Sequence, residues 1–512
     1  MKVYEKIIKI LQAHSILIPI TLLGGFLRLY RLNTEYVWFN DTFFRLLPSL
    51  EIAKGLSPNY DPMMTGVTYF FVPYFYFFKG LFGVQLIVTI LGILIIPLSY
   101  YLILKLNDTK LAASFFSFFV SINPTFTALS KVLIWDILIL LFFIVSFIVL
   151  IKLSNEKNNL YSIIISFLLF FLFTLKAPNI LFAPIYYIFL FYKRKFKIKE
   201  SNDILFSVMV FILLMALHFF YFPEVFTKFI EVGGENFFVI TKYVETIKSS
   251  IIVLLFPFNS PPSSMYFARQ FNFNLLDIPL LLFFVTLLFY LKSNFKEKNI
   301  LIISIILTFT FFYINFSGWS HRYLVVPIYL MLLLLTKSIL SIPKKYKNLV
   351  ILGIIIGISI SFYSTYEMVS NWNRANSYIE NNIVTRNSSF EDIEKMAYES
   401  NVDLIVSTYG KVFIFNKISK GGDIGVIDFR SITTEELIQV INQNLVENKK
   451  IWYVEGWPDN YVFGGRPTSE YKNAIFEMFL LKEIYRGKDT YMDNEGNEKS
   501  SFIVHEIIKN KK

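Results

Sequence analysis

The chain has 512 residues, of which 55% are hydrophobic and 18% aromatic, with 57 Phe and 31 Tyr. This composition excludes an ordinary soluble protein and predicts a polytopic membrane protein. The formal net charge of +11 could indicate a nucleic-acid partner, but most of the excess lies in short segments between apolar runs, so we expect no nucleic acid. The absence of Cys excludes disulfides and thiolate metal sites.

Apolar segments that could enter a bilayer recur along the first 365 residues. They lie at residues 15–30, 84–104, 111–123, 133–151, 161–175, 179–191, 204–221, 275–291, 300–316, 323–340 and 349–364. Residues 67–78 are short, aromatic and interrupted by Pro73, so we expect an interfacial helix there. The basic leader at residues 1–14 continues into the first segment without a small-residue cleavage site, which predicts a retained anchor. The fold class is therefore a helical bundle of about eleven transmembrane helices.

Lys and Arg gather in every second segment that connects these spans. The basic segments are the N-terminus and residues 105–110, 152–157, 193–199, 292–298 and 344–347. The positive-inside rule places such segments in the cytoplasm. We therefore predict a multi-pass protein of the plasma membrane with a cytoplasmic N-terminus and an extracytoplasmic C-terminus. The loops at residues 31–66 and 222–274 and the hairpin tips at Asn123-Pro124 and Lys176 then lie on the outer side.

From about residue 366 the composition becomes that of a soluble protein. We therefore divide the chain into a transmembrane domain, residues 1–365, and a soluble extracytoplasmic domain, residues 366–512. Helices are expected at residues 389–400, 434–448 and 470–486, and strands at 402–407, 424–429, 450–454 and 501–507. This alternation predicts a small α/β domain. Thr433, with Glu436 three residues later, has the pattern of a capping box.

The segment at residues 31–62 is polar, aromatic and acidic, and we expect it to form the first outer loop. Asp41 and Asp61 are its candidate catalytic residues. A carboxylate beside the membrane can act as a general base toward an acceptor hydroxyl, or help to bind a divalent cation such as Mg²⁺ or Mn²⁺. The alternative is that both acids are solvated, and Asp61-Pro62 is also ordinary turn chemistry.

Charged residues also stand at the ends of the predicted spans. Lys131 and Asp136 flank the start of the span at residues 133–151. Ionisable groups within a bilayer tend to face a cavity or a partner; Lys131 could instead extend to the interface, whereas the shorter Asp136 needs a partner. Lys176 and Arg322 are outer-side cations that would suit a lipid phosphate, although either one alone could simply anchor a helix end.

Four short motifs follow one another along these outer segments. They are Asn40-Asp41 with Gly55, Asn123-Pro124 with Ser130 and Asp136, Thr174-Leu175-Lys176-Ala177-Pro178, and Arg322-Tyr323 with Pro327. In this order they resemble motifs of the GT-C membrane glycosyltransferases, in particular the branch of protein O-mannosyltransferases and lipid A aminoarabinose transferases. That family has an Asp-Glu pair where this chain has Asn40-Asp41, so an amide occupies the position of the first acid. The resemblance covers about residues 15 to 345.

The resemblance implies an inverting glycosyltransferase that takes a sugar from a dolichyl- or undecaprenyl-phosphate donor. The acceptor would be a protein, a glycan or a lipid at the extracytoplasmic face. Asp41, with or without Asp61, would act as base or orient the acceptor, and Lys176 and Arg322 would stabilise the departing phosphate. Asp136 would orient Lys131 or the donor. The candidate substrate-binding residues are then Asn40, Lys131, Asp136, Lys176, His321, Arg322 and Tyr323.

Two other functions remain open at this point. An oligosaccharyltransferase-like enzyme would also have an acidic first loop and an outer domain, but the sequence contains no Trp-Trp-Asp motif. A flippase or transporter of lipid-linked sugars is the second alternative. Transporters tend to contain inverted repeats, and we find none in this sequence.

Overall fold

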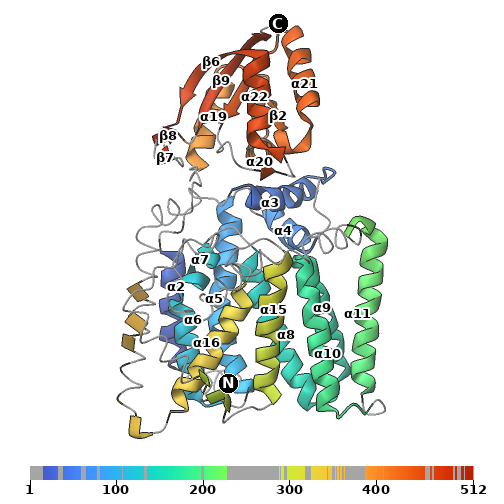
Figure 1. The fold of residues 1–512 in the computed structure, drawn as a ribbon, viewed down its shortest axis with the longest axis vertical. Helices are drawn as coiled ribbons and strands as arrows, with labels where there is room; N and C mark the ends of the chain where they lie inside the picture. Colours follow the sequence, from blue (N-terminus) through green and yellow to red (C-terminus); the bar gives the residue numbers. More distant parts are fainter. Residues whose placement is uncertain are drawn as a thin grey trace, which may run out of the picture. The chain divides into compact units, whose positions relative to one another are not determined.

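The computed structural model describes most of the chain between residues 15 and 510 (Figure 1). The described residues are 15–30, 32, 39–58, 65–77, 81–106, 108–131, 135–197, 201–225, 227, 287–288, 290–292, 297–316, 324–342, 344–346, 348, 352, 355–356, 358–359, 362–363, 387–407, 409–455, 462–463, 466–487, 490–492, 498–500 and 502–510. The chain forms two compact units. The first comprises Met1–Leu32, Asp61–Val67 and Gln85–Trp372, and the second comprises Asn33–Tyr60, Thr68–Val84 and Asn373–Lys512.

The first unit is helical. Its α-helices are α2 (Leu17–Leu29), α5 (Leu81–Lys105, of which Leu81–Val84 lie in the second unit), α6 (Lys110–Ile122), α7 (Pro124–Lys131), α8 (Asp136–Asn155), α9 (Asn159–Leu175), α10 (Phe182–Lys193), α11 (Asn202–Tyr221), α15 (Glu297–Phe316) and α16 (Val325–Leu340). Its described residues also form the 3-10 helices η2 (Ala177–Leu181) and η7 (Lys344–Tyr346). Figure 1 shows α9, α10 and α11 running side by side.

Among the described residues, three helices are long and apolar enough to cross a membrane: α5, α8 and α11. The pair α6 and α7, bent by 54°, makes a fourth if it is a single broken span. Shorter apolar helices lie at Leu17–Leu29, Asn159–Leu175, Lys298–Thr310 and Val325–Leu340. These helices fit a polytopic membrane protein. The number of eleven spans stays a prediction, because most of residues 275–291 and 349–364 lie outside the described part of the chain.

The expected hairpin tip at Asn123-Pro124 is wrong, because Pro124 opens helix α7. Proline suits the first position of a helix, where its missing N–H would have no intrahelical partner. The Asn123 side chain accepts a hydrogen bond from the backbone N–H of Phe126 at 3.2 Å and thereby caps α7. The chain therefore passes from one helix to the next through a bend.

The expected loop at residues 31–62 is also wrong in part, because Phe39–Ala53 forms helix α3. Its buried residues Phe43, Leu46, Leu47 and Leu50 recur at helical spacing. The polar residues between them lower the average hydropathy, so the segment lacks the continuous apolar run that predicts the other helices. Helix α4 (Thr65–Phe77) confirms the helix expected at residues 67–78, and its interfacial position stays a prediction.

The second unit contains a five-stranded sheet with strand order β2-β1-β3-β9-β6. Its strands are β1 (Leu404–Ser407), β2 (Gly425–Asp428), β3 (Ile451–Glu455), β6 (Phe479–Arg486) and β9 (Ile503–Asn510). Strand β1 is parallel to both β2 and β3, whereas β9 is antiparallel to both β3 and β6. Two small hairpins pair β4 (Val462–Phe463) with β5 (Arg466–Pro467) and β7 (Thr490–Met492) with β8 (Glu498–Ser500).

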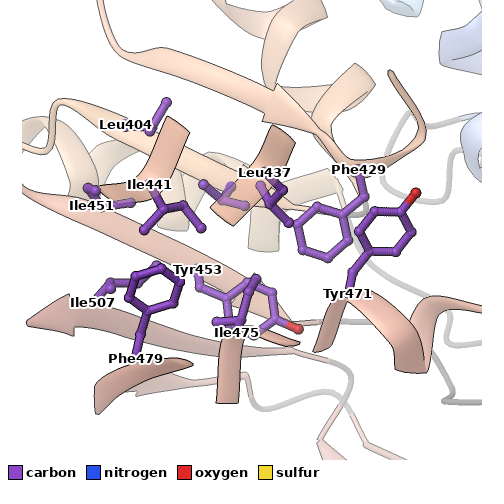
Figure 2. Packing of buried hydrophobic residues seen from close by; sticks show 11 residues of the cluster. Leu404, Phe429, Leu437, Ile441, Ile451, Tyr453, Tyr471, Ile475, Phe479 and Ile507 are labelled. Atoms are coloured by element: carbon purple, nitrogen blue, oxygen red, sulfur yellow. The ribbon is translucent and has the colours of Figure 1, made fainter. Parts of the chain in front are cut away.

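Helices α19 (Asn387–Glu399), α20 (Gly410–Lys420), α21 (Thr434–Val446) and α22 (Thr468–Met478), with the 3-10 helix η8 (Phe429–Ser431), accompany this sheet. Figure 2 shows the apolar core that α21 and α22 share with the sheet, with Leu437 and Ile475 facing Tyr453. Phe429 and Tyr471 stack at its edge, with ring centroids 5.1 Å apart. The predicted capping box is confirmed: Thr433 and Glu436 exchange hydrogen bonds at 3.2 and 2.7 Å.

The helix expected at residues 470–486 is wrong beyond Met478, where the chain continues as strand β6. Leu480, Leu481, Ile484 and Tyr485 have the spacing of a helical face, which explains the expectation. Strand β6 instead pairs with β9 along its length. A strand that is specified by a distant partner does not show this in its local pattern.

The start of α4 lies very close to the end of α9. A Cβ added at Gly66 would be 2.4 Å from Thr174 Oγ1 and 2.8 Å from the Thr174 carbonyl carbon. Because the second atom belongs to the backbone, a rotamer change cannot relieve the contact. Only glycine fits this position without moving the end of α9.

We predict that Gly66→Ala destabilises the protein by about 1–3 kcal/mol, the usual range for overpacking. Thermal unfolding of the purified protein in detergent measures this as a lower Tm. Gly25→Ala in α2 is the control, since an added Cβ there would lie 3.7 Å from the nearest atom, an ordinary contact. Equal melting temperatures for Gly66→Ala and Gly25→Ala would contradict the prediction.

A buried carboxylate makes the second unit sensitive to pH. The Glu394 side chain on α19 is 11% exposed, and the Lys420 ammonium lies 3.6 Å from its carboxylate. Burial raises the pKa of Glu394 from its ordinary 4.5 to about 7. The protonated carboxyl is therefore favoured in the folded state, and its stabilisation is full below pH 4.5 and is lost as the pH rises to 7.

We predict that the wild-type protein loses stability on the order of 2–3 kcal/mol between pH 4.5 and 7, and that the Glu394→Gln variant does not show this loss. Hydrogen exchange of α19 against pH, corrected for the intrinsic exchange rate, measures this. The matched control is Glu391→Gln. Glu391 also pairs with Lys420, at 3.4 Å, but the Glu391 side chain is 52% exposed. The prediction is wrong if wild type and Glu394→Gln have the same pH profile.

Candidate functional site

Asp136 and Lys176, two of the predicted site residues, form an ion pair in the first unit. Asp136 Oδ1 lies 3.9 Å from Lys176 Nζ, and the side chains are 1% and 6% exposed. Asp136 is the first residue of α8, and Lys176 directly follows α9. The prediction that Asp136 has a partner is confirmed, and Lys176 is a partner that the sequence alone did not indicate.

The turn after α9 brings Lys176 to this position. Lys176 leaves the helix with an extended backbone, while its N–H still donates to Leu172 O at 3.2 Å. The Asn179 side chain donates to the same carbonyl oxygen at 2.9 Å, and the Asn179 N–H donates to Lys176 O, also at 2.9 Å. Asn179 therefore holds the turn that carries Lys176. The sequence interpretation missed this residue; its signal is an amide directly after Ala177-Pro178, at a helix end.

Lys131, predicted to bind substrate, contacts backbone oxygen atoms. Its ammonium group donates to the carbonyl of Tyr30 and lies 3.4 Å from the carbonyl oxygen of Arg28. Both carbonyls lie at the end of α2, where no intrahelical donor follows. Lys131 therefore caps α2, and its binding of substrate stays a prediction.

Arg28, which the sequence interpretation also missed, caps α6 in the same way. Its fully buried guanidinium donates to Ser121 O at 2.9 Å and Val120 O at 3.1 Å, both in the last turn of α6. It also donates to Gly24 O at 3.0 Å and to Ser130 Oγ at 3.3 Å. The available signal was a charged residue near the end of an otherwise apolar predicted span.

Helix α5 completes these contacts at the end of α7. Gln85 Nε2 donates to Lys131 O at 2.7 Å, and Thr89 Oγ1 donates to Ser130 O at 2.9 Å. The carbonyl groups at the bend and at the end of α7 are thus bonded to side chains from α2 and α5. Asp136 opens α8 five residues beyond Lys131. The capped end of α7 therefore comes shortly before Asp136, one member of the ion pair, in the sequence.

Asn40 and Asp41 lie in the first turn of α3, the helix of the second unit that replaces the expected loop. The side chains of these two residues, and all of Asp61, His321, Arg322 and Tyr323, lie outside what the structure describes. Their predicted roles therefore stay predictions.

No group of three or more His, Asp or Glu residues in the described part of the chain could hold a metal ion. The acids predicted to contact a divalent cation, Asp41 and Asp61, could not be tested in this way because their side chains are not described. Use of Mg²⁺ or Mn²⁺ therefore stays a prediction.

Residues 65–219 match the family model of the dolichyl-phosphate-mannose-protein mannosyltransferases. This stretch, about 30% of the chain, includes Lys131, Asp136 and Lys176. A search of curated protein sequences finds no match.

The fold is similar to that of ArnT from Cupriavidus metallidurans. In its crystal structure bound to undecaprenyl phosphate, ArnT is 10% identical, with 97% of this chain and 98% of that chain covered and a TM-score of 0.61. Its apo structure is 9% identical, with 96% and 97% covered and a TM-score of 0.58.

The apo oligosaccharyltransferase from Archaeoglobus fulgidus is 12% identical, with 95% of this chain and 74% of that chain covered and a TM-score of 0.53. At these identities the structural likenesses show a shared fold. The family match and this fold confirm the predicted resemblance of the chain to the GT-C membrane glycosyltransferases, and with it the prediction that the chain is a glycosyltransferase.

Proposed function

We propose that the chain transfers a sugar from a polyprenyl-phosphate donor to an acceptor hydroxyl or amide at the extracytoplasmic face of the plasma membrane. The observation that carries the proposal is the match of residues 65–219 to the protein mannosyltransferase family, within which the Asp136–Lys176 pair lies. The fold shared with ArnT, which was crystallised with undecaprenyl phosphate, supports a donor on a polyprenyl phosphate. A lipid-anchored donor also explains why such an enzyme would be built of membrane helices.

In the proposed reaction the acceptor oxygen or nitrogen attacks the anomeric carbon of the sugar. The bond from this carbon to the phosphate oxygen breaks, and the polyprenyl phosphate leaves with the electron pair. Negative charge therefore develops on the phosphate, where a cation accelerates the reaction. Lys176, with Arg322 as the second predicted cation, takes this role.

Asp136 stabilises the ammonium group of Lys176 while no phosphate is bound. A buried cation without a counter-charge would be strongly unfavourable, so a carboxylate at 3.9 Å keeps the site ready for an anion. The separation exceeds a normal hydrogen bond, which is consistent with a pair that can open when phosphate binds. Asp136 in this proposal is a positioning residue for Lys176.

Asp41 is the proposed base, which removes the proton of the acceptor as the new bond forms, or orients the acceptor for attack. Asp61 is the second acid of the same predicted segment. A divalent cation, if one binds, would supply Lewis-acid chemistry there, and Asp41 and Asp61 would be its ligands.

Sugar transfer by the purified protein tests the proposal, with dolichyl-phosphate mannose and undecaprenyl-phosphate sugars as donors. We predict that Asp41→Asn lowers kcat by about 100- to 10,000-fold, the contribution typical of a positioned base. Asp392→Asn, which alters an exposed acid on α19, is the control. Full activity of Asp41→Asn would remove Asp41 from the mechanism. Transfer of whole glycans, or lipid movement across vesicles without sugar transfer, would favour the two alternative functions.

We predict that Lys176→Ala weakens the binding of undecaprenyl phosphate to the purified protein by about 10- to 100-fold, because a hydrogen bond to a charged group is lost. Lys337→Ala is the matched control: Lys337 on α16 is also buried and pairs with Asp108 at 2.6 Å.

A lower stability of Lys176→Ala could mimic this effect, because the variant leaves Asp136 without its counter-charge. The double variant Asp136→Asn/Lys176→Met removes both charges and should recover stability without recovering affinity. Unchanged affinity in both Lys176 variants would contradict the predicted phosphate contact.

A further inference from the structure

The helix that carries Asp41 is packed inside the second unit. Phe43, Leu46, Leu47 and Leu50 of α3 are each at most 3% exposed. Their spacing places them along one face of the helix. An apolar face that is buried along about two turns requires a packing partner, so α3 belongs to the structural core of this unit.

Phe415 on α20 supplies part of this packing. Its side chain is 1% exposed, and its ring meets that of Phe43 edge-on, with centroids 5.3 Å apart and planes at 69°. On α4 it meets Phe75 in the same manner, at 5.8 Å and 67°. Aromatic pairs with this geometry attract one another beyond the effect of burial alone. One side chain thus joins α3, α4 and α20.

Two further contacts fix these helices. The Ser49 hydroxyl on α3 donates to Thr68 O on α4 at 2.8 Å. At the start of α20, a Cβ added to Gly410 would lie 2.4 Å from the Cα of Asp428 on β2, so α20 begins in close contact with the sheet. Helix α20 therefore connects α3 to the sheet.

We propose that Phe415 is a positioning residue for the sugar transfer: it holds α3, and through α3 it sets the place of Asp41 in the first turn of that helix. This inference rests on the proposed function, in which Asp41 acts on the acceptor. It assigns the C-terminal residues a part in catalysis. A small displacement of a catalytic group is enough to slow a reaction strongly.

Hydrogen exchange of α3 in the purified full-length protein tests the packing. Phe415→Ala removes both ring contacts and should accelerate exchange of the α3 amides by about 10- to 100-fold. Phe413→Ala is the control: Phe413 is on the same helix and also 1% exposed, but its ring meets Phe390 of α19 at 5.5 Å. Unchanged exchange of α3 in Phe415→Ala, or an equal rise in Phe413→Ala, would overturn the inference.

Transfer from dolichyl-phosphate mannose tests the positioning. Phe415→Ala should lower kcat by about 10- to 100-fold with the donor KM unchanged, and Phe415→Leu should recover most of the loss. The double variant Asp41→Asn/Phe415→Ala should be only slightly slower than Asp41→Asn alone. Both substitutions remove the same contribution, namely that of a correctly placed Asp41.

Multiplicative losses in the double variant would show that Phe415 does not act through Asp41. An unchanged kcat in Phe415→Ala despite faster exchange of α3 would likewise overturn its positioning role. If the wild-type protein transfers no sugar, the proposed function fails, whereas the exchange rates of α3 still decide whether Phe415 holds this helix.

Discussion

A helix that ends in a buried interior leaves its last carbonyl groups without water to bond, and in the first unit side chains from other helices supply the missing donors. Arg28 supplies donors where α6 ends, Lys131 where α2 ends, and Gln85 and Thr89 where α7 ends. These side chains come from helices far apart in the sequence, so each helix end depends on a neighbour. The break between α6 and α7 is stable because its carbonyl groups are bonded. Because Lys131 bonds backbone oxygen atoms, it fixes the end of α2 whether or not a ligand is present.

The Asp136–Lys176 pair uses helix ends in a different way. Asp136 stands at the start of α8 and Lys176 just beyond the end of α9, and the helix dipole favours a negative charge at the first position and a positive charge at the second. The two helices therefore lower the free energy of a buried charge pair that an apolar interior would otherwise disfavour. A phosphate at Lys176 would compete with Asp136 for the ammonium group. Such competition weakens product binding, which helps an enzyme that must release polyprenyl phosphate after every transfer.

The features that could be predicted from the sequence depend on neighbours along the chain. Long apolar runs predicted α5, α8 and α11, and the Thr433–Glu436 spacing predicted a cap that the structure contains. The features that were missed depend on distant partners: β6 is a strand because β9 pairs with it, and α3 is a helix whose apolar face is covered by other elements. The same holds in the site. Asp136 could be predicted to need a partner, but nothing near it in the sequence indicates Lys176, forty residues away.

Asn40 makes the placement of α3 especially important. The resembling enzymes have two adjacent acids where this chain has Asn40-Asp41, so a single carboxylate is available in the first turn of α3. With two acids, a shift of the helix could bring the second one into use. With one, the proposed base works only while α3 is held in place, and the buried contacts of Phe43 with Phe415 are part of what holds it. An enzyme with one acid at this position would therefore depend more strongly on the packing between α3 and α20 than an enzyme with two.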